Sequence, residues 1–330
     1  MKTDTREKIA KYIQIQGQVT PHELVTTFGI TQAMVHRHLN RLLQVGTVQR
    51  VGQPPKVFYI PAEKIKTLPT ITNWPEEIER LLEKEWCYLN PDGVMLFGVK
   101  GFLTWAQVTG QDYDLLSLAK EYSHYRQNAN KLYQTNGLID ATQKVVETFD
   151  QAWLDKLYYQ DFYSLPKFGK TKLGTLVLHA KQSQSFELIE QLTRLIQPKI
   201  DLLVDQYKIE AVGYIPHSIK RKLEFLPTIK ARVKLNLPEV KLEKAYVGGV
   251  PIAQKSLSRL VERIENAKNS IFIRKRYPLP KRVLLIDDAV GSGATLNETA
   301  KKLKQQYQID QVIGFAIVGS LKGFPVITEV

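Results

Sequence analysis

The second half of the chain alternates between short apolar runs and amphipathic segments. Runs of roughly four to eight apolar residues are typical of buried strands, and apolar positions three or four residues apart are typical of helices. This alternation predicts an α/β domain over residues 166–330, with a parallel sheet and helices on its faces. The strands are expected at 173–178, 211–215, 283–286 and 312–318, and the helices at 185–197 and 297–306.

The first 61 residues have a different pattern, in which three amphipathic helices precede two short strands. The second helix is expected to begin after Thr20, which can cap it, and to end at Gly29. Thr31 can cap a longer third helix, and residues 47–60 are expected to form two strands around a Gly-Gln-Pro-Pro turn. This order of elements resembles the winged helix-turn-helix of bacterial repressors. Residues 1–61 are therefore predicted to be an α+β winged helix.

The resemblance implies that the third helix enters the major groove of double-stranded DNA and that nearby cations meet phosphates. DNA half-sites are paired, so a homodimer is implied as well. The alternative is a winged helix that serves only protein contacts or dimerisation. The side chains expected to face DNA lie on the third helix and the wing: Gln32, Ala33, His36, Arg37, Asn40, Arg41, Arg50 and Lys56.

Residues 74–165 carry all four Trp residues but no recognisable chemical motif. Their pattern predicts a mostly helical connector behind a linker at residues 62–73, with the aromatic side chains in a core or a dimer interface. The lone Cys87, expected at a helix end, excludes an internal disulfide and a Cys-cluster zinc site. Helices are expected at 75–86, 101–107, 115–129 and 140–159, and a short strand at 94–99.

The charge of the chain indicates polyanionic partners. The formal net charge is +13, and residues 220–282 hold 17 Lys and Arg against five Glu. Basic regions attract nucleic acid and polyphosphorylated ligands, although Lys-rich surfaces can also serve solubility alone. No apolar run approaches the length of a membrane span and no signal peptide is expected. The chain is therefore predicted to be cytoplasmic, without a membrane partner.

The most specific chemical pattern follows the strand expected at 283–286. Asp287 and Asp288 come directly after the apolar run, and a Gly-Ser-Gly turn at 291–293 precedes a helix. Backbone N–H groups at such a turn can hold a phosphate, and the carboxylates can accept hydrogen bonds from sugar hydroxyls or hold a cation. The pattern favours a phosphosugar site over a solvated acidic pair. Its spacing differs from the dinucleotide fingerprint and from the Walker loop.

This segment resembles the motif with which type I phosphoribosyltransferases bind phosphoribosyl pyrophosphate (PRPP). In the family, four apolar residues, Asp-Asp and two small residues precede Thr-Thr-Gly; here Gly291 and Ser292 replace the two threonines. The resemblance implies that Asp287 and Asp288 contact the ribose hydroxyls and serve catalysis. It also implies Mg²⁺ as a cofactor that accompanies PRPP, with no protein ligand assigned to it. The residues implied to bind PRPP are Asp287, Asp288, Ala289, Gly291, Ser292, Gly293, Ala294 and Thr295.

A second, basic loop follows the strand expected at 211–215. Ligands of parallel sheets bind beyond the carboxyl ends of the strands, so this loop and the one after residue 286 should border one site. In the family the corresponding loop contacts pyrophosphate, and here it would supply donors to two linked phosphates. The alternative is a plain exposed turn. The residues assigned to this loop are Pro216, His217, Ser218, Lys220 and Arg221.

Within the family, the chain resembles the competence-associated, ComF-like branch over about half of its length. Lys181 in Leu-His-Ala-Lys is similar to the branch's Leu-Lys-Tyr segment. Gln254, Arg263 and Asn266 are similar to its Gln-x-x-Leu…Arg-x-x-Asn element. The chain departs from the branch at Lys222-Leu-Glu-Phe225, where Arg-Gly-Phe-Asn is usual, and it lacks the branch's zinc-binding cysteines.

Two functions are compatible with these patterns. The combination of a winged helix with a phosphoribosyltransferase-like domain in one chain favours a transcriptional regulator. Its winged helix would bind DNA and its second domain would sense PRPP or a nucleotide, as in purine repressors of similar plan. The alternative is an active, Mg²⁺-dependent phosphoribosyltransferase that transfers phosphoribose from PRPP to a base, in DNA uptake or nucleotide salvage. The intact pair Asp287 and Asp288 is compatible with this enzymatic function.

Overall fold

The computed structural model describes residues 4–53, 55–62, 74–219, 222, 224–274 and 280–320. The chain divides into two compact units, Met1–Thr72 and Asn73–Val330. Each unit has a hydrophobic core of its own. The predicted linker at 62–73 lies, from residue 63 onward, outside the described residues.

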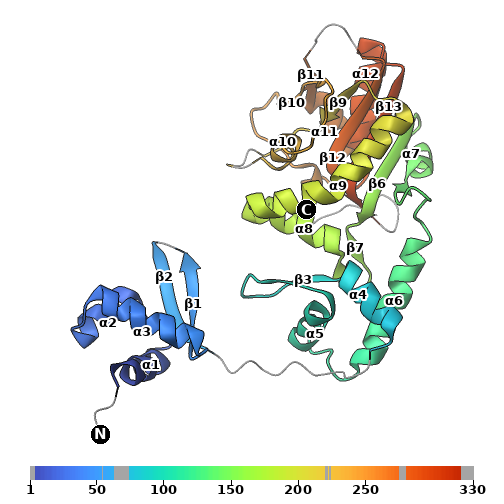
Figure 1. The fold of residues 1–330 in the computed structure, drawn as a ribbon. Helices are drawn as coiled ribbons and strands as arrows, with labels where there is room; N and C mark the ends of the chain where they lie inside the picture. The colour runs from blue at the N-terminus through green and yellow to red at the C-terminus, as the bar shows by residue number, and fades with distance from the viewer. Residues whose placement is uncertain are drawn as a thin grey trace. The chain divides into compact units, whose positions relative to one another are not determined.

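In the first unit, three helices precede an antiparallel hairpin, in the order that the sequence predicts (Figure 1). Thr20 and Glu23 cap the second helix through reciprocal hydrogen bonds, and Gly29 ends it in the left-handed conformation. The helices pack against the hairpin, and Val19 forms a β-bridge to the buried Tyr59. The elements are α1 (Thr5–Gln16), α2 (Pro21–Phe28), α3 (Gln32–Gln44), β1 (Val48–Gln53) and β2 (Lys56–Pro61).

The second unit is built on a five-stranded sheet of order β5-β6-β13-β12-β9. The sheet is parallel except at β5, which runs antiparallel to β6. β12 lies between β13 and β9, with Ile286 opposite both Phe315 and Tyr214. The strands are β5 (Ile139–Asp140), β6 (Lys156–Phe162), β9 (Ala211–Tyr214), β12 (Arg282–Val290) and β13 (Gln311–Gly319).

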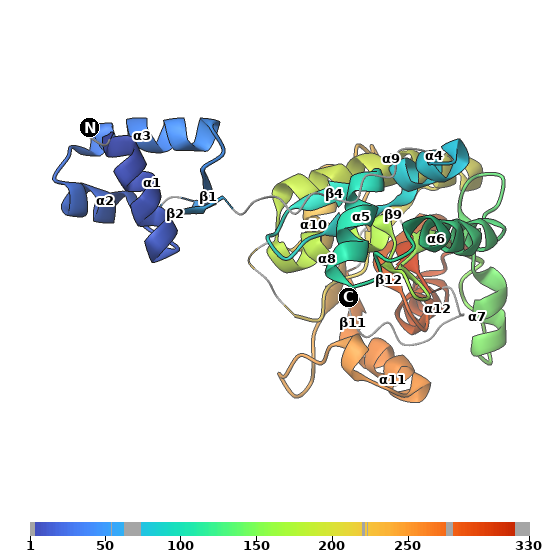
Figure 2. The ribbon, with the colours of Figure 1, turned by 90° about the horizontal axis from the view of Figure 1, so that it is seen from below.

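Helices cover both faces of this sheet (Figures 1 and 2). α8 (Lys172–Ser183) and α9 (Phe186–Tyr207) bury one face, in a core that includes Leu284 and Phe315. α12 (Ala294–Tyr307) connects β12 to β13. Parallel crossovers are right-handed, and the β6-to-β9 connection crosses the sheet in the opposite direction from the β12-to-β13 connection. The two connections therefore place their helices on opposite faces.

The other elements precede the sheet or lie between its strands. Three strand pairs, β3-β4, β7-β8 and β10-β11, are short and antiparallel. The elements are α4 (Glu76–Glu85), β3 (Cys87–Leu89), β4 (Met95–Phe97), α5 (Gly98–Val108), α6 (Leu115–Asn130), α7 (Thr142–Thr148), β7 (Ser164–Leu165), β8 (Gly169–Lys170), α10 (Phe225–Lys230), β10 (Leu242–Lys244), η1 (Gln254–Ser256), α11 (Leu260–Ser270) and β11 (Ile271–Ile273).

Residues 173–178 form part of helix α8, so the strand predicted from their apolar run is wrong. All six residues are buried, which removes the polar face that would have revealed a helical period. A short apolar run cannot be assigned to a strand or a buried helix from periodicity alone. The local signal for a helix is Thr171, whose side chain accepts a hydrogen bond from the Gly174 N–H.

The helix predicted at 140–159 is also wrong, because these residues contribute β5, α7 and the start of β6. β6 pairs in parallel with β13, with Asp161 opposite Val318. Residues 74–165 are thus no separate helical connector, since their strands β5 and β6 belong to the main sheet. The pairing partner of β6 lies far along the chain, so no local pattern specifies it.

The helices predicted at 75–86, 101–107 and 115–129 are confirmed as α4, α5 and α6. Cys87 begins strand β3 instead of ending a helix, and its side chain is buried. Burial raises the pKa of the Cys87 thiol to about 12. A thiol that stays protonated is a poor nucleophile, so the buried Cys87 side chain serves packing.

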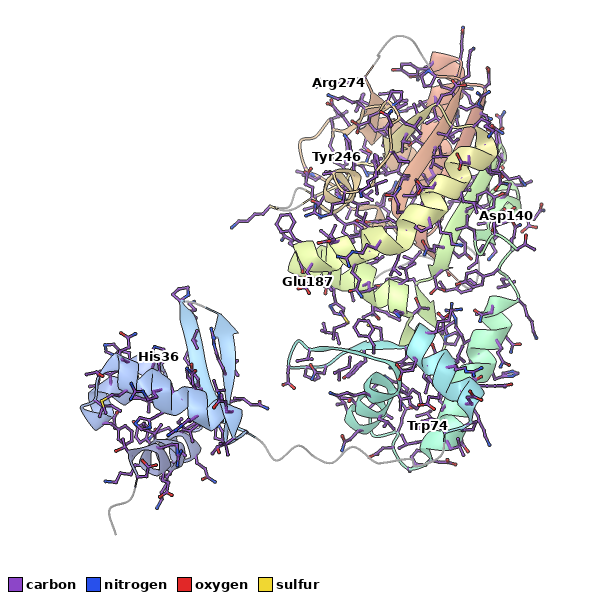
Figure 3. All side chains as sticks on the ribbon, viewed as in Figure 1. His36, Trp74, Asp140, Glu187, Tyr246 and Arg274 are labelled. Atoms are coloured by element: carbon purple, nitrogen blue, oxygen red, sulfur yellow. The ribbon has the colours of Figure 1, made fainter. Side chains whose placement is uncertain are left out.

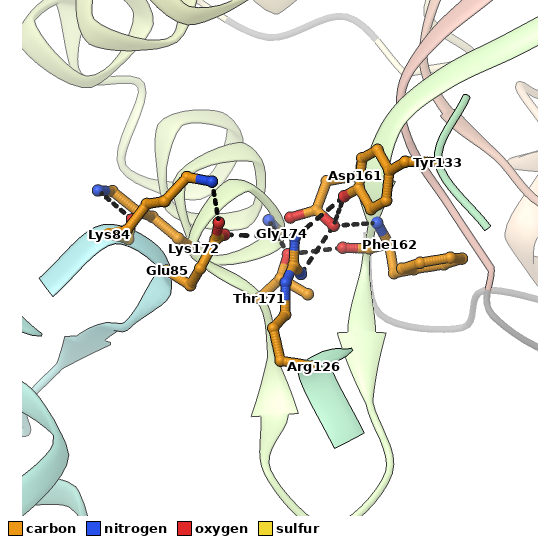
Figure 4. A network of polar contacts seen from close by, with 9 residues as sticks. All are labelled: Lys84, Glu85, Arg126, Tyr133, Asp161, Phe162, Thr171, Lys172 and Gly174. Carbon is orange, nitrogen blue, oxygen red and sulfur yellow. Dashed lines mark hydrogen bonds and ion pairs between the residues drawn. The ribbon is translucent and has the colours of Figure 1, made fainter. Parts of the chain in front are cut away.

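A buried charge cluster ties α4 and α6 to the sheet (Figure 4). The Arg126 guanidinium on α6 is 4% exposed and donates to Asp161 Oδ1 on β6 at 2.9 Å. Its second nitrogen lies 3.2 Å from Glu85 Oε2 on α4 and donates to the Tyr133 hydroxyl at 3.0 Å. Asp161 is buried and its ion pair is with Arg126, so removal of the guanidinium would leave this carboxyl group without a counter-charge, whereas Glu85 would keep its ion pair with Lys84.

We expect Arg126→Met to lower the free energy of unfolding by about 3–5 kcal/mol, because the buried Asp161 would lose its counter-charge. Chemical denaturation followed by circular dichroism measures this loss. Arg194→Met is the control: Arg194 pairs with Glu190 on the surface, and its removal should cost less than about 1 kcal/mol. Equal losses from both substitutions would contradict the role of the cluster.

Candidate functional site

The loops that follow β9 and β12 border one cavity. The two strands are parallel neighbours, so their carboxyl ends meet at the same edge of the sheet. The cavity has a volume of about 190 Å³. Its lining joins the two predicted loops to side chains from α8, β10, η1 and α11: Lys181, Ile215, Pro216, His217, Ser218, Ile219, Lys244, Ala253, Gln254, Arg263, Asp287, Asp288, Ala289, Val290, Gly291, Ser292, Gly293, Ala294, Thr295 and Leu296.

Two lysines accompany the acidic pair. Asp287 and Asp288 are consecutive residues of β12, and successive side chains of a strand point to opposite faces. Lys181 on α8 forms an ion pair with Asp288, and both side chains are only about one-tenth exposed. Lys244 on β10 acts electrostatically on Asp287, and its Nζ donates to Ser218 Oγ at 2.8 Å. Each carboxyl group therefore has a lysine near it.

The two carboxyl groups differ in their affinity for protons. Burial and repulsion from Asp288 raise the pKa of the Asp287 carboxyl to about 8. Burial disfavours the charged form of Asp288 too, but Lys181 and His217 hold the pKa of that carboxyl below its usual value. Asp288 is therefore the carboxyl group that favours its negative charge, while Asp287 favours its protonated form, in which it can donate a hydrogen bond.

The turn after β12 presents the start of a helix to the cavity. Gly293 caps α12 with a φ of +75°, a conformation that side chains with a Cβ rarely adopt. The Ala294 N–H faces Ser292 Oγ at 3.4 Å, a long contact. The backbone N–H groups of the first turn of a helix and its dipole favour an anion such as a phosphate. The structure thus shows a turn followed by a helix start at residues 291–295, and the binding of an anion there stays a prediction.

The loop after β9 contributes Pro216, His217 and Ser218 to the same cavity. The Leu226 N–H donates to His217 Nε2 at 3.1 Å, which fixes the orientation of the ring. Of the residues assigned to this loop from the sequence, Lys220 and Arg221 lie outside the described residues. The structure thus brings the described part of both predicted loops together.

Gln254 and Arg263 close another side of the cavity. Gln254 Nε2 donates to the Arg263 carbonyl at 3.1 Å, and Arg263 Nε donates to the Leu257 carbonyl at 2.8 Å. Gln254 Oε1 and Arg263 Nη2 are buried and have no hydrogen-bond partner among the described residues. Buried polar groups without a partner are costly, at about 1–3 kcal/mol each. A ligand that supplied partners would therefore bind favourably at this side of the cavity.

Sequence reasoning assigned no role to three of these cations. Lys181 and Arg263 are part of the resemblance to the ComF-like branch, which gives them no role in binding. The sequence did not single out Lys244 at all. Lys244 lies in a long basic segment in which nothing local separates it from its neighbours. The signal is tertiary: the pairing of β10 with β11 places Lys244 beside Ser218 and Asp287.

The donor set of the cavity does not form a metal centre. Within the described ranges, no group of three or more His, Cys, Asp and Glu side chains could hold a metal ion. The two carboxyl groups face lysines, and one of them favours its protonated form. The expected Mg²⁺ therefore finds no protein-built site among these residues.

In the first unit, all eight residues predicted to face DNA are exposed. Six lie on α3, including His36, which is labelled in Figure 3, and Arg50 and Lys56 lie on the hairpin. Val35, Leu39 and Leu42 take the opposite, buried side of α3. The helix thus presents a polar and basic surface, while its apolar side forms the core.

Two comparisons bear on the identity of the chain. It matches no model of a known protein family and no curated protein sequence. Among the described residues, no helix is long and apolar enough to cross a membrane. The argument for function therefore rests on the residues of the two units.

The raised pKa of Asp287 predicts a pH dependence of stability. A carboxyl group with a folded pKa of about 8, against 3.8 as its ordinary value, takes up a proton on folding. Its contribution is fully present below about pH 4 and is lost as the pH rises through about 8. We expect Asp287→Asn to remove this loss, so that stability falls less between about pH 5 and 8 than in the wild type.

Denaturation at a series of pH values measures the slope of the free energy of unfolding against pH for the wild type and for Asp287→Asn. Asp205→Asn, at an exposed position of α9, is the control and should keep the slope of the wild type. An Asp287→Asn slope equal to that of the wild type would show that Asp287 titrates normally.

Proposed function

We propose that the second unit binds PRPP or a related phosphosugar in the cavity between β9 and β12. The observation that carries the proposal is the meeting of three features: a helix-capped anion turn at 291–295, a buried acidic pair and the loop at 216–218. In this arrangement the 5′-phosphate lies at the turn and the ribose hydroxyls contact Asp287 and Asp288. The pyrophosphate lies at the loop after β9.

Charge supports an anionic ligand. The cavity lining holds Lys181, Lys244 and Arg263 as fixed cations against Asp287 and Asp288. These three cations outnumber the two carboxyl groups, and the preference of Asp287 for its protonated form increases the positive excess. The positive end of the α12 dipole adds to this excess. A phosphosugar with several negative charges matches the balance, whereas a neutral sugar would leave it uncompensated.

We propose further that the whole chain is a transcriptional regulator that responds to PRPP or a nucleotide. The supporting observation is the exposed basic surface of α3 and the β1-β2 hairpin in the first unit, which has the element order of a winged helix-turn-helix. A ligand regulates only if it binds two states of the protein with different affinity. Paired DNA half-sites make a homodimer the expected form on DNA.

The second candidate is a phosphoribosyltransferase, which the unpaired atoms of Gln254 and Arg263 favour. A carbonyl oxygen and a guanidinium N–H beside the phosphosugar could orient an acceptor base. The base nitrogen would attack C1 of the ribose as the bond to pyrophosphate breaks, and the lysines would stabilise the charge that leaves. No side chain needs to act as a nucleophile. Release of pyrophosphate with a panel of bases would favour the enzyme over the sensor.

We expect PRPP to raise the melting temperature of the protein. Ligand at about 100 times its Kd adds about 2.7 kcal/mol, or roughly 5–10 °C for a unit of this size. Asp288→Asn should abolish most of the shift, because it removes an acceptor for the ribose and disturbs Lys181. Asp205→Asn should keep the full shift. Absence of a shift in the wild type would overturn PRPP binding and both candidate functions.

We expect the protein to bind a DNA fragment that carries the promoter of its own operon, in a gel-shift assay. Binding should weaken steeply as salt rises, because phosphate contacts release counterions. Arg37→Ala, on the exposed side of α3, should cost about 1–3 kcal/mol of binding free energy. Lys11→Ala removes an exposed charge from α1 as the control. Binding that is absent or insensitive to salt would count against the DNA-binding role.

A further inference from the structure

The position of Lys244 in the cavity indicates a more specific role than a general attraction of anions. Its ammonium group contacts Ser218 on the loop proposed for pyrophosphate, through Nζ and Oγ at 2.8 Å. The same group interacts electrostatically with Asp287, the carboxyl proposed for the ribose. Lys244 therefore links the two halves of the proposed ligand site. An ammonium has three N–H donors, and Ser218 accepts one of them.

Lys181 has a related position beside the other carboxyl group. It comes from α8 and forms a buried ion pair with Asp288. The Phe225 ring lies 5.9 Å from its Nζ and limits the water around it. Lys181 and Lys244 thus bring two positive charges to the acidic pair, on rigid secondary structure. Two charges equal the charge of one Mg²⁺ ion.

A divalent cation at a phosphate site usually combines one or two carboxylates with oxygens of the substrate phosphates. Here Asp288 already has Lys181 as its ion-pair partner, Asp287 lies within electrostatic influence of Lys244, and the described residues include no cluster that could hold a metal. A cation that entered between Asp287 and the loop at 216–218 would meet the ammonium of Lys244. Repulsion from that ammonium would disfavour the ion, whereas a phosphate would be attracted.

We propose that the ammonium group of Lys244, supported by Lys181, takes the place of a divalent cation between the pyrophosphate and the acidic pair. The site would then bind a pyrophosphate-bearing phosphosugar with little need for Mg²⁺. The inference rests on the proposed PRPP site. In the bound state, the free donors of Lys244 reach the pyrophosphate while the carboxyl groups contact the ribose hydroxyls. Lys181 stays beside Asp288 and keeps the pair compensated.

The test is isothermal titration of the full-length protein with PRPP, once with Mg²⁺ and once with EDTA. For the wild type we expect the two dissociation constants to differ by less than about tenfold, which corresponds to about 1.4 kcal/mol. Lys244→Gln should weaken binding in EDTA by about tenfold or more, the size expected for the loss of a charge-assisted hydrogen bond. Mg²⁺ should restore a large part of that loss.

Lys241→Gln is the matched control, since Lys241 is exposed just before β10 and carries the same charge. It should keep the affinity of the wild type with and without Mg²⁺. Thermal unfolding of each variant verifies that it is folded, and Lys244→Arg, which keeps the charge, should bind in EDTA better than Lys244→Gln.

The outcomes separate this inference from the function on which it rests. If the wild type binds PRPP with Mg²⁺ but loses tenfold or more in EDTA, the lysines do not replace the cation, while the PRPP site stands. If Lys244→Gln and the wild type depend equally on Mg²⁺, Lys244 has no such role. If PRPP does not bind with Mg²⁺ either, the proposed function and this inference both fail.

Discussion

The parallel pairing of β12 with β9 and β13 is the constraint on which the site depends. It aligns the carboxyl ends of β9 and β12, so that a loop near residue 216 and a turn near residue 291 border one cavity although some 70 residues separate them. It also places Asp287 and Asp288 in the second half of β12, an interior strand of the sheet, where Asp288 is buried and Asp287 partly buried. Every chemical property of the site follows from that burial, because buried carboxyl groups must be protonated or paired.

The two carboxyl groups satisfy this requirement in different ways. Asp288 is paired with Lys181, whereas Asp287 favours its protonated form. The result is a cavity with an excess of positive charge that can still offer oxygens and an O–H group to sugar hydroxyls. A sensor and an enzyme would both need this combination. The exposed basic surface of the first unit supports the proposed sensor, and the unpaired buried atoms of Arg263 and Gln254 support the proposed enzyme.

Prediction from the sequence succeeded where local chemistry is distinctive. Helix α2 begins after Thr20 and ends at Gly29, and both caps depend only on neighbouring residues. The Gly-Ser-Gly turn at 291–293 marks a helix start for the same reason. Prediction failed where burial removes the polar positions that reveal a helical period. Residues 173–178 of α8 are an example, because all of them are buried. It failed again at β6, whose partner β13 lies about 150 residues along the chain.

By itself, the sequence determined the Gly-Ser-Gly turn before α12, the acidic pair on β12 and the helix caps of the first unit, since each depends on adjacent residues. Only the tertiary structure decided which cations face the acidic pair. Lys244 is one of many lysines in its segment, and Lys181 lies on a helix that resembled a strand. Charge compensation acts over a few ångströms through space, and the sheet brings those side chains together from distant parts of the chain.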